Sequence, residues 1–165
     1  MAKKTAKSKA RIKETGCCKP FNPAPWDNKT ITWKGRLFVK VHSLSFLHIP
    51  INMGSVIART MEKIWAAKAA GEQLMLSDEC SLWGSDNYIA VTKPVPGMQT
   101  VRISGTFLSQ VYKGPYSKMG EWMKDMEAHA AAKGRKVKKL YFYYTMCPAC
   151  AKAYGQNYTV LLAQV

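Results

Sequence analysis

Four of the chain's five cysteines fall in two short motifs that are suited to holding a metal ion. Cys147 and Cys150 form a Cys-Pro-x-Cys knuckle, and Cys17 and Cys18 are adjacent in the first part of the sequence. Four thiolates in a tetrahedral arrangement hold structural zinc, so the two motifs together are a candidate zinc site. Adjacent cysteines are an awkward half of such a site, because zinc ligands are usually separated by a spacer. Reduced, partly buried thiols are the favoured alternative, and we predict no obligatory cofactor.

Carboxylates are scarce, with 10 acidic residues against 25 basic ones, and each is therefore informative. Glu79 follows Asp78 in a predicted strand. In an apolar pocket its charge would attract cationic ligands, and it would be able to act as a general base; a solvated strand residue is the alternative. Glu121 falls in the first turn of a predicted helix. A carboxylate is favourable there because it lies at the positive end of the helix dipole, so Glu121 has a structural explanation. An enzyme would take one of these glutamates as its base, helped by the hydroxyl of Tyr112 or Tyr141.

Aromatic and methionine side chains supply the largest set of candidate ligand contacts. Flat rings bind planar, apolar or cationic molecules by stacking and cation–π attraction, and methionines repack easily around varied ligands. Plain core packing is the alternative, and it is favoured for Trp65 and Trp122 because both lie on helical stripes. Alternation along one strand places Tyr141 and Tyr143 on the face opposite Phe142, and either face is able to line a cavity. The predicted ligand contacts are Trp65, Glu79, Trp83, Tyr112, Tyr116, Met119, Trp122, Met123, Tyr141 and Tyr143.

Several common catalytic patterns are absent from the sequence. The three histidines are scattered, and no Ser–His–Asp order or metal-binding histidine pair is visible. No glycine-rich phosphate loop or Gly-x-Gly motif follows a predicted strand, so no nucleotide cofactor is implied.

Charge divides the chain into three parts. The formal net charge is +15, and six basic residues precede the first acid, so residues 1–15 read as a disordered basic tail. We predict that this tail is mainly solubilising, with weak non-specific contact to nucleic acid as the alternative. Residues 16–30 form a Pro- and Cys-rich arm, and residues 31–165 form the folded domain. No run of 18 apolar residues and no secretion signal are visible, which favours a cytoplasmic protein without a membrane span.

The folded domain shows one order of elements twice. Strands are predicted over residues 31–49, 74–83 and 87–93, with a helix through Ile57, Met61, Ile64 and Trp65 that Asn52 or Ser55 caps and Gly71 ends. The second half repeats this with strands over 100–112, 140–145 and 157–164. Its helix begins at Ser117 and stops at Gly134. Turns are expected at residues 84–86, a bend at Gly105 and a loop over 146–156. The pattern predicts an α+β fold of two βαββ units in pseudo-twofold arrangement, with an antiparallel sheet and both helices on one face. A ligand cleft is expected where the units meet.

One segment, Val111-Tyr112-Lys113-Gly114-Pro115-Tyr116-Ser117 followed by a helix with Trp122, resembles the GyrI-like family of small-molecule-binding domains. The resemblance covers residues 31–165 in layout, and the cysteine motifs suggest a stand-alone branch. Two departures matter. The region before Ile31 is too short and Pro-rich for a helix-turn-helix, and the strand over 140–145 lacks the acid that many members place there.

The resemblance implies a stand-alone binding protein for planar apolar or cationic aromatic ligands in an aromatic-lined cleft. It also implies an alternative, because some GyrI-like proteins are hydrolases that open reactive small rings. The missing acid favours the binding protein over the enzyme. The sequence does not identify the ligand or the oligomeric state.

Overall fold

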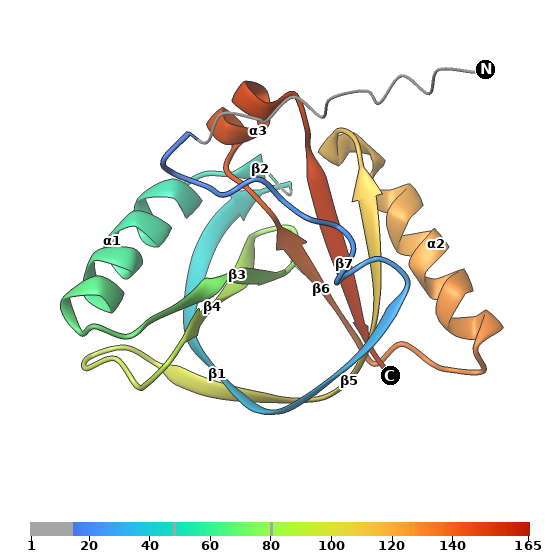
Figure 1. Cartoon of the computed structure of the whole chain (residues 1–165), viewed down its shortest axis with the longest axis horizontal. Coiled ribbons are helices and arrows are strands. Elements are labelled where there is room, and N and C mark those ends of the chain that lie inside the picture. Colours follow the sequence, from blue (N-terminus) through green and yellow to red (C-terminus); the bar gives the residue numbers. More distant parts are fainter. Residues whose placement is uncertain (1–14, 48, 80) are drawn as a thin grey trace, which may run out of the picture.

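Each half of the chain folds as strand, helix, strand, strand, and the predicted α+β fold is confirmed (Figure 1). The computed structural model describes residues 15–47, 49–79 and 81–165, so residues 1–14 of the predicted tail lie outside the described part. The first half contains β1 (Lys29–Phe46), β2 (Ile49–Pro50), α1 (Met53–Ala66), β3 (Ala70–Asp78) and β4 (Gly84–Val91). The second contains β5 (Thr100–Lys113), η1 (Tyr116–Lys118), α2 (Met119–Ala132), β6 (Lys139–Tyr144), α3 (Pro148–Tyr154) and β7 (Tyr158–Gln164).

The two halves pair their strands in the same way, as a pseudo-twofold arrangement requires. In the first half β4 lies between β1 and β3, and in the second half β7 lies between β5 and β6, always antiparallel. Two antiparallel seams join the halves. β3 pairs with β6, where Ser77 is opposite Phe142, and β1 pairs with β5. The second seam closes the sheet into a barrel-like ring, which Figure 1 shows from one end.

Alternating side chains give this closed sheet an inner and an outer face. The inner face is aromatic and buried; it includes Trp33, Phe38, Tyr88, Phe107, Tyr141 and Tyr143. The rings of Trp33 and Phe107 lie 4.7 Å apart, and those of Tyr88 and Tyr141 lie 5.7 Å apart, edge to face. These rings pack against one another inside the sheet, so the inner face is a core in this structure.

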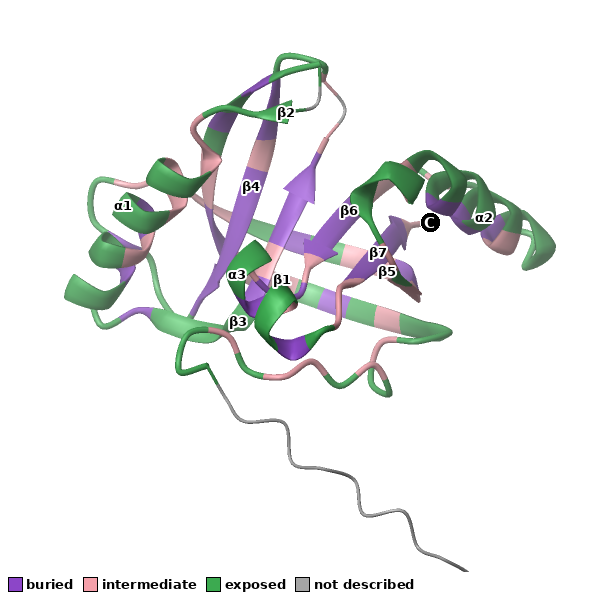
Figure 2. Ribbon diagram, turned by 90° about the horizontal axis from the view of Figure 1, so that it is seen from above, coloured by how far each residue is buried: buried purple, intermediate pink, exposed green. Residues whose placement is uncertain are grey.

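Both long helices cover the outer face, on opposite sides of the central seam (Figures 1 and 2). α1 packs Ile64 against Val39 and Ile89, and α2 packs Trp122 and Met126 into a cluster with Phe142 and Leu161. Each helix therefore buries an apolar stripe against its own half of the sheet. Trp65 departs from the predicted stripe, because its side chain is 61% exposed. Between the helices, the outer face near the β3–β6 seam also carries polar side chains, among them Ser77 on β3 and Tyr144 at the end of β6.

Three predicted boundaries are wrong. Residues 84–86 belong to β4 and not to a turn, since β4 begins at Gly84 and the preceding strand has ended at Asp78. Gly84 allows β4 to lie close to β1, because a Cβ there would lie 2.8 Å from the carbonyl oxygen of Ser43. Gly71 lies inside β3, five residues after α1 has ended at Ala66. The predicted loop over 146–156 contains α3, which starts at Pro148 and ends at Tyr154, and Gly155 caps it with a φ of 62° that favours glycine.

The predicted side-chain caps are also absent from the described helices. The Asn52 side chain accepts a hydrogen bond from the backbone N–H of Leu44 at 2.7 Å, which ties the start of α1 to β1 instead. Ser117 lies in the single turn η1, and α2 begins two residues later at Met119. The expected irregularity at Gly105 is close to the observed one, since the β1–β5 register shifts between Trp33, the partner of Gly105, and Arg36.

The Pro- and Cys-rich arm lies along the sheet and ends where β1 begins. The ring of Phe21 contacts Tyr158, with centroids 5.5 Å apart, and the ring of Trp26 lies 5.2 Å from that of Tyr143. The hydroxyl of Ser109 donates a 2.6 Å hydrogen bond to the carbonyl of Trp26. Among the described residues, no helix combines the length and the apolar character that crossing a membrane requires.

Candidate functional site

A carboxylate and a phenol meet on the outer face of the central seam. Glu79 directly follows β3, and Tyr144 is the last residue of β6. These strands are antiparallel neighbours with Leu76 opposite Tyr143, so the two side chains meet diagonally across the seam, where the hydroxyl of Tyr144 donates a hydrogen bond to Oε1 of Glu79. The ring of Tyr116, in η1, packs edge-on against that of Tyr144 with centroids 5.2 Å apart. The site therefore combines one carboxylate with two phenols from three separate segments of the chain.

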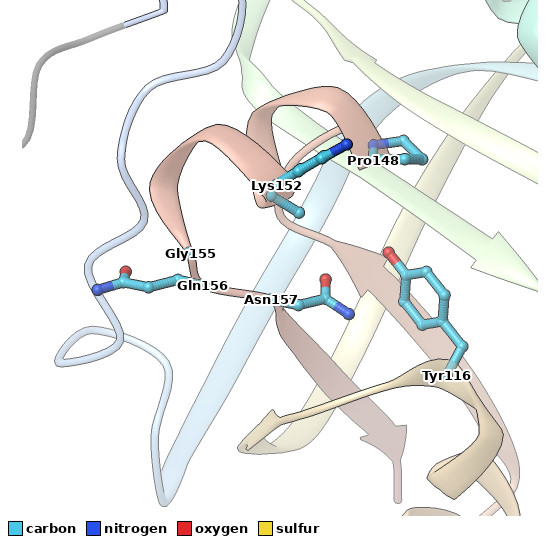
Figure 3. A pocket seen from close by; sticks show the side chains of 7 residues that line it. Tyr116, Pro148, Lys152, Gly155, Gln156 and Asn157 are labelled. Atoms are coloured by element: carbon cyan, nitrogen blue, oxygen red, sulfur yellow. The ribbon is translucent and has the colours of Figure 1, made fainter.

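An open hollow of about 380 Å³ adjoins Tyr116. Its wall is formed by α3 and by the loop that leads into β7; the lining residues are Tyr116, Pro148, Ala151, Lys152, Gly155, Gln156 and Asn157. Figure 3 shows the Tyr116 hydroxyl directed toward Pro148, with the Asn157 side chain to the left of the ring. Asn157 donates a 2.8 Å hydrogen bond to the carbonyl of Gly114, while its buried Oδ1 has no partner within the described residues. The hollow thus offers an apolar wall and several polar groups to a small molecule.

The surroundings keep both phenols protonated. Burial raises the pKa of Tyr144 well above its usual value, and the negative charge of Glu79 raises it further. Burial also raises the pKa of Tyr116, again with a contribution from the charge of Glu79. A phenol that stays protonated remains a hydrogen-bond donor at neutral pH. The group therefore contains two donors beside one carboxylate, an arrangement that is able to hold a water molecule and accept its proton.

Further polar atoms underlie this seam. Ser77 Oγ, Asn87 Oδ1 and Thr159 Oγ1 are buried and have no hydrogen-bond partner within the described residues. Ser77 lies opposite Asn87 in the β3–β4 ladder, and Thr159 lies opposite Tyr144 in the β6–β7 ladder. Buried polar atoms are rarely left unpaired. Their concentration between the helices marks this part of the outer face as polar, in contrast to the aromatic inner face.

Of the ten residues predicted as ligand contacts, Glu79 and Tyr116 are the two that meet at this site. Trp65 and Trp83 are each 61% exposed. Met119 and Trp122 belong to the core under α2, and Met123 is 37% exposed on that helix. Tyr141 and Tyr143 lie on the inner face.

The two other candidates for catalysis lie apart from Glu79. The hydroxyl of Tyr112 donates a 2.7 Å hydrogen bond to Asp125, and the Tyr112 ring stacks on Trp122. Glu121 is exposed in the first turn of α2.

Sequence reasoning missed Tyr144, Asn157 and Lys152. A signal existed for Tyr144, since strand alternation already places it on the face opposite Tyr141 and Tyr143. Nothing in the sequence indicates that its partner is Glu79, because that contact depends on which strands form the central seam.

The candidate metal ligands do come together. The Sγ atoms of the cysteine cluster all lie within 4.8 Å of one another; the cluster consists of Cys17, Cys18, Cys147 and Cys150. The adjacent pair from the arm has its sulfurs 3.8 Å apart, and Cys150 is buried. The cluster lies where the arm meets α3, which also forms one wall of the hollow.

Comparisons with known proteins show both a family and a fold. A family model described as "Bacterial hydrolase" matches residues 8–165. A solved structure, described as a hydrolase from Listeria innocua, superposes with a TM-score of 0.55 and 12% sequence identity, covering 84% of this chain and 92% of that chain. At this identity the likeness concerns the fold. The curated proteins contain no match to the chain. The closed sheet is compatible with the GyrI-like resemblance, which itself stays a prediction.

Proposed function

The chain belongs to the bacterial hydrolase family, and from this premise we propose that it hydrolyses a small electrophilic molecule with Glu79 as the general base. The sequence alone favours a binding protein over an enzyme. Membership of the family favours the alternative, the hydrolase. The observation that carries the choice of residue is the contact between Glu79 and Tyr144 beside the hollow at Tyr116.

In the proposed reaction Glu79 accepts a proton from a water molecule, and the oxygen of that water bonds to an electrophilic carbon of the substrate. The bond from this carbon to the leaving atom breaks, and Tyr116 donates its proton to the leaving atom. Transfer of the proton from Glu79 to Tyr116 through solvent restores the starting state. Tyr144 is a positioning residue, because its hydrogen bond fixes one oxygen of Glu79 and leaves the other for water.

The proposed substrate class is a strained, electrophilic small ring such as an epoxide or an activated cyclopropane. Opening such a ring needs a base for water and a proton donor for the departing atom, and the site contains one of each. The hollow has a volume of about 380 Å³, which suits a small molecule, and Pro148 and Ala151 give it an apolar wall. The ring-opening hydrolases of the GyrI-like family, which the sequence resembles, motivate this class.

The test compares Glu79→Gln with Glu121→Gln on a panel of epoxides and activated cyclopropanes. Glu121 is exposed in α2, so its variant is matched in chemistry and removes no group of the site. We expect Glu79→Gln to lower turnover by about 10²–10⁴-fold, as loss of a general base does. Substrate binding, followed by tryptophan fluorescence, should persist in both variants. Saturable binding without turnover by the unmodified chain, or equal turnover by both variants, would contradict the proposal.

A further inference from the structure

We propose that the cysteine cluster binds one zinc ion through four thiolates and that this ion fastens the arm to α3. The inference concerns a structural ion and does not depend on the proposed hydrolase activity. It rests on the arrangement of four sulfurs from two distant segments, residues 17–18 and 147–150. On binding, each thiol releases a proton to solvent, because zinc takes cysteine as the thiolate.

The distances between the sulfurs fit tetrahedral zinc. A Zn–S bond of about 2.3 Å in a tetrahedron places the sulfurs about 3.8 Å apart. Cys17 Sγ and Cys18 Sγ are separated by 3.8 Å, and all four sulfurs of the cluster lie within 4.8 Å of one another. The adjacent cysteines, an awkward pair when judged by spacing, thus present their sulfurs at the separation that zinc requires. The largest distance needs a contraction of about 1 Å, which rotation about side-chain bonds supplies.

Hydrogen-bond partners lie beside two of the four sulfurs, those of Cys18 and Cys150. The backbone N–H of Cys147 donates to Cys18 Sγ at 3.4 Å, and the hydroxyl of Thr15 lies 3.1 Å from Cys150 Sγ. Tyr154 in turn receives a 2.9 Å hydrogen bond from the backbone N–H of Thr15 and holds the start of the arm against α3. Such partners around ligand atoms orient them and stabilise their charge. The net charge of +15 on the chain also favours a zinc–thiolate centre of net charge −2.

The position of the cluster explains what the ion would do. One pair of ligands precedes the arm residues Phe21 and Trp26, whose rings lie on Tyr158 and Tyr143 of the sheet. The other pair flanks the first turn of α3, which forms part of the wall of the hollow. An arm of this kind has few backbone hydrogen bonds to the sheet. Zinc would therefore hold both the arm and α3 in place, as structural zinc does in small modules.

Zinc content is the first measurement. The full chain is purified under reducing conditions with zinc, dialysed and analysed by elemental mass spectrometry. We expect about one zinc per chain, and a value near zero for Cys147→Ser and for Cys17→Ser. Cys80→Ser changes the fifth cysteine of the sequence, which is not one of the four proposed ligands, and should retain the metal. Equal zinc content in Cys147→Ser and Cys80→Ser would overturn the proposal.

Two further measurements keep the test decisive if the serine variants fail to fold. Cobalt added to the metal-free, unmodified chain should give the intense visible bands of tetrahedral cobalt together with thiolate-to-metal charge transfer. Zinc added to the same metal-free chain should raise its Tm by about 10 °C at saturating metal. An octahedral cobalt spectrum with an unchanged Tm overturns the proposal, as does a mass showing disulfides within the cluster in the chain purified under reducing conditions.

Discussion

The hydroxyl of Tyr144 donates its hydrogen bond to the carboxylate of Glu79 from the other half of the molecule. Tyr144 ends β6 of the second half, and Glu79 follows β3 of the first. The contact exists because these two strands form the central seam, so the fold assembles the site as it joins its two units. Both helices leave this strip of the outer face to polar groups, and the hollow begins next to it at Tyr116.

Tyr144→Phe removes the hydroxyl that fixes Glu79 while leaving the ring in place. A hydrogen bond to a charged group contributes about 1.5–3 kcal/mol, so we expect turnover to fall by about 10–100-fold with little change in KM. Tyr112→Phe is the comparison, since Tyr112 on β5 donates to Asp125 on α2 in a similar phenol–carboxylate pair. Steady-state kinetics on a substrate found with the epoxide panel measures both. Equal losses in the two variants would assign the effect to general destabilisation.

The pH dependence of turnover should show no decline on the alkaline side up to about pH 10. Burial and the charge of Glu79 raise the pKa of both Tyr144 and Tyr116 above the ordinary value for tyrosine, about 10. A raised pKa keeps each phenol protonated to a higher pH, so both remain donors throughout this range. Rates on an uncharged substrate, with folding followed by fluorescence, provide the measurement. A decline centred below pH 9 that disappears in Tyr116→Phe would show that the phenol ionises too early for this role.

The repeated order of strands and helices was predictable because it depends on local patterns of apolar and polar residues. Alternation and helical stripes are set by neighbouring residues, so β1, α1, β5 and α2 are near their predicted positions. Two of the wrongly predicted features are the turn at Gly84, in the first half, and the loop that contains α3, in the second. The predicted turn at Gly84 fails because this glycine lets two strands approach closely, and α3 was missed because a seven-residue helix shows almost no periodicity.

The sites were less predictable because they depend on contacts between distant segments. The sequence singles out Glu79, Tyr116 and the cysteine motifs, each on chemical grounds. It does not reveal that β3 and β6 are neighbours, and without this pairing the side chain of Tyr144 would not reach Glu79 across the seam. In the same way, the return of the arm to α3 brings Cys17 to Cys147 across the chain. The aromatic pair Tyr141 and Tyr143 was ambiguous between core and cleft, and the structure places it in the inner core.

Methionines on α2 provide a test of which face of that helix supports the fold. Met126 is fully buried among Phe142 and Leu161, whereas Met123, one turn earlier, is 37% exposed. Met126→Ala leaves a cavity and should lower the free energy of unfolding by about 2–5 kcal/mol. Met123→Ala should change it by less than about 0.5 kcal/mol. Urea denaturation measures both, and similar losses would mean that α2 packs through a different face.

A carboxylate on β4, that of Asp86, makes the stability of the fold depend on pH in the acid range. Asp86 accepts contacts from Lys40 Nζ at 2.8 Å and from His42 Nδ1 at 2.9 Å, both on β1. Burial alone would raise the pKa of Asp86, but the hydrogen bonds from Lys40 and His42 outweigh it and hold this pKa below its usual value. A carboxyl whose pKa is lower in the folded state stabilises the fold above its unfolded pKa of about 3.9. That contribution is lost as the pH falls through the folded pKa.

Asp86→Asn should therefore be less stable than the unmodified chain at pH 7, by about 0.5–1 kcal/mol, because the ion pair is partly exposed. The gap should narrow as the pH falls through the lowered folded pKa of Asp86, since the carboxyl then becomes protonated and neutral in both states of the unmodified chain. Glu62→Gln is the matched control. It removes the same charge from an exposed position on α1 with no ion pair among the described residues. Urea denaturation at pH 7 and pH 3 measures the difference. A gap of the same size at both pH values would show that the amide disturbs packing, and that the paired carboxylate is not what stabilises β4 against β1.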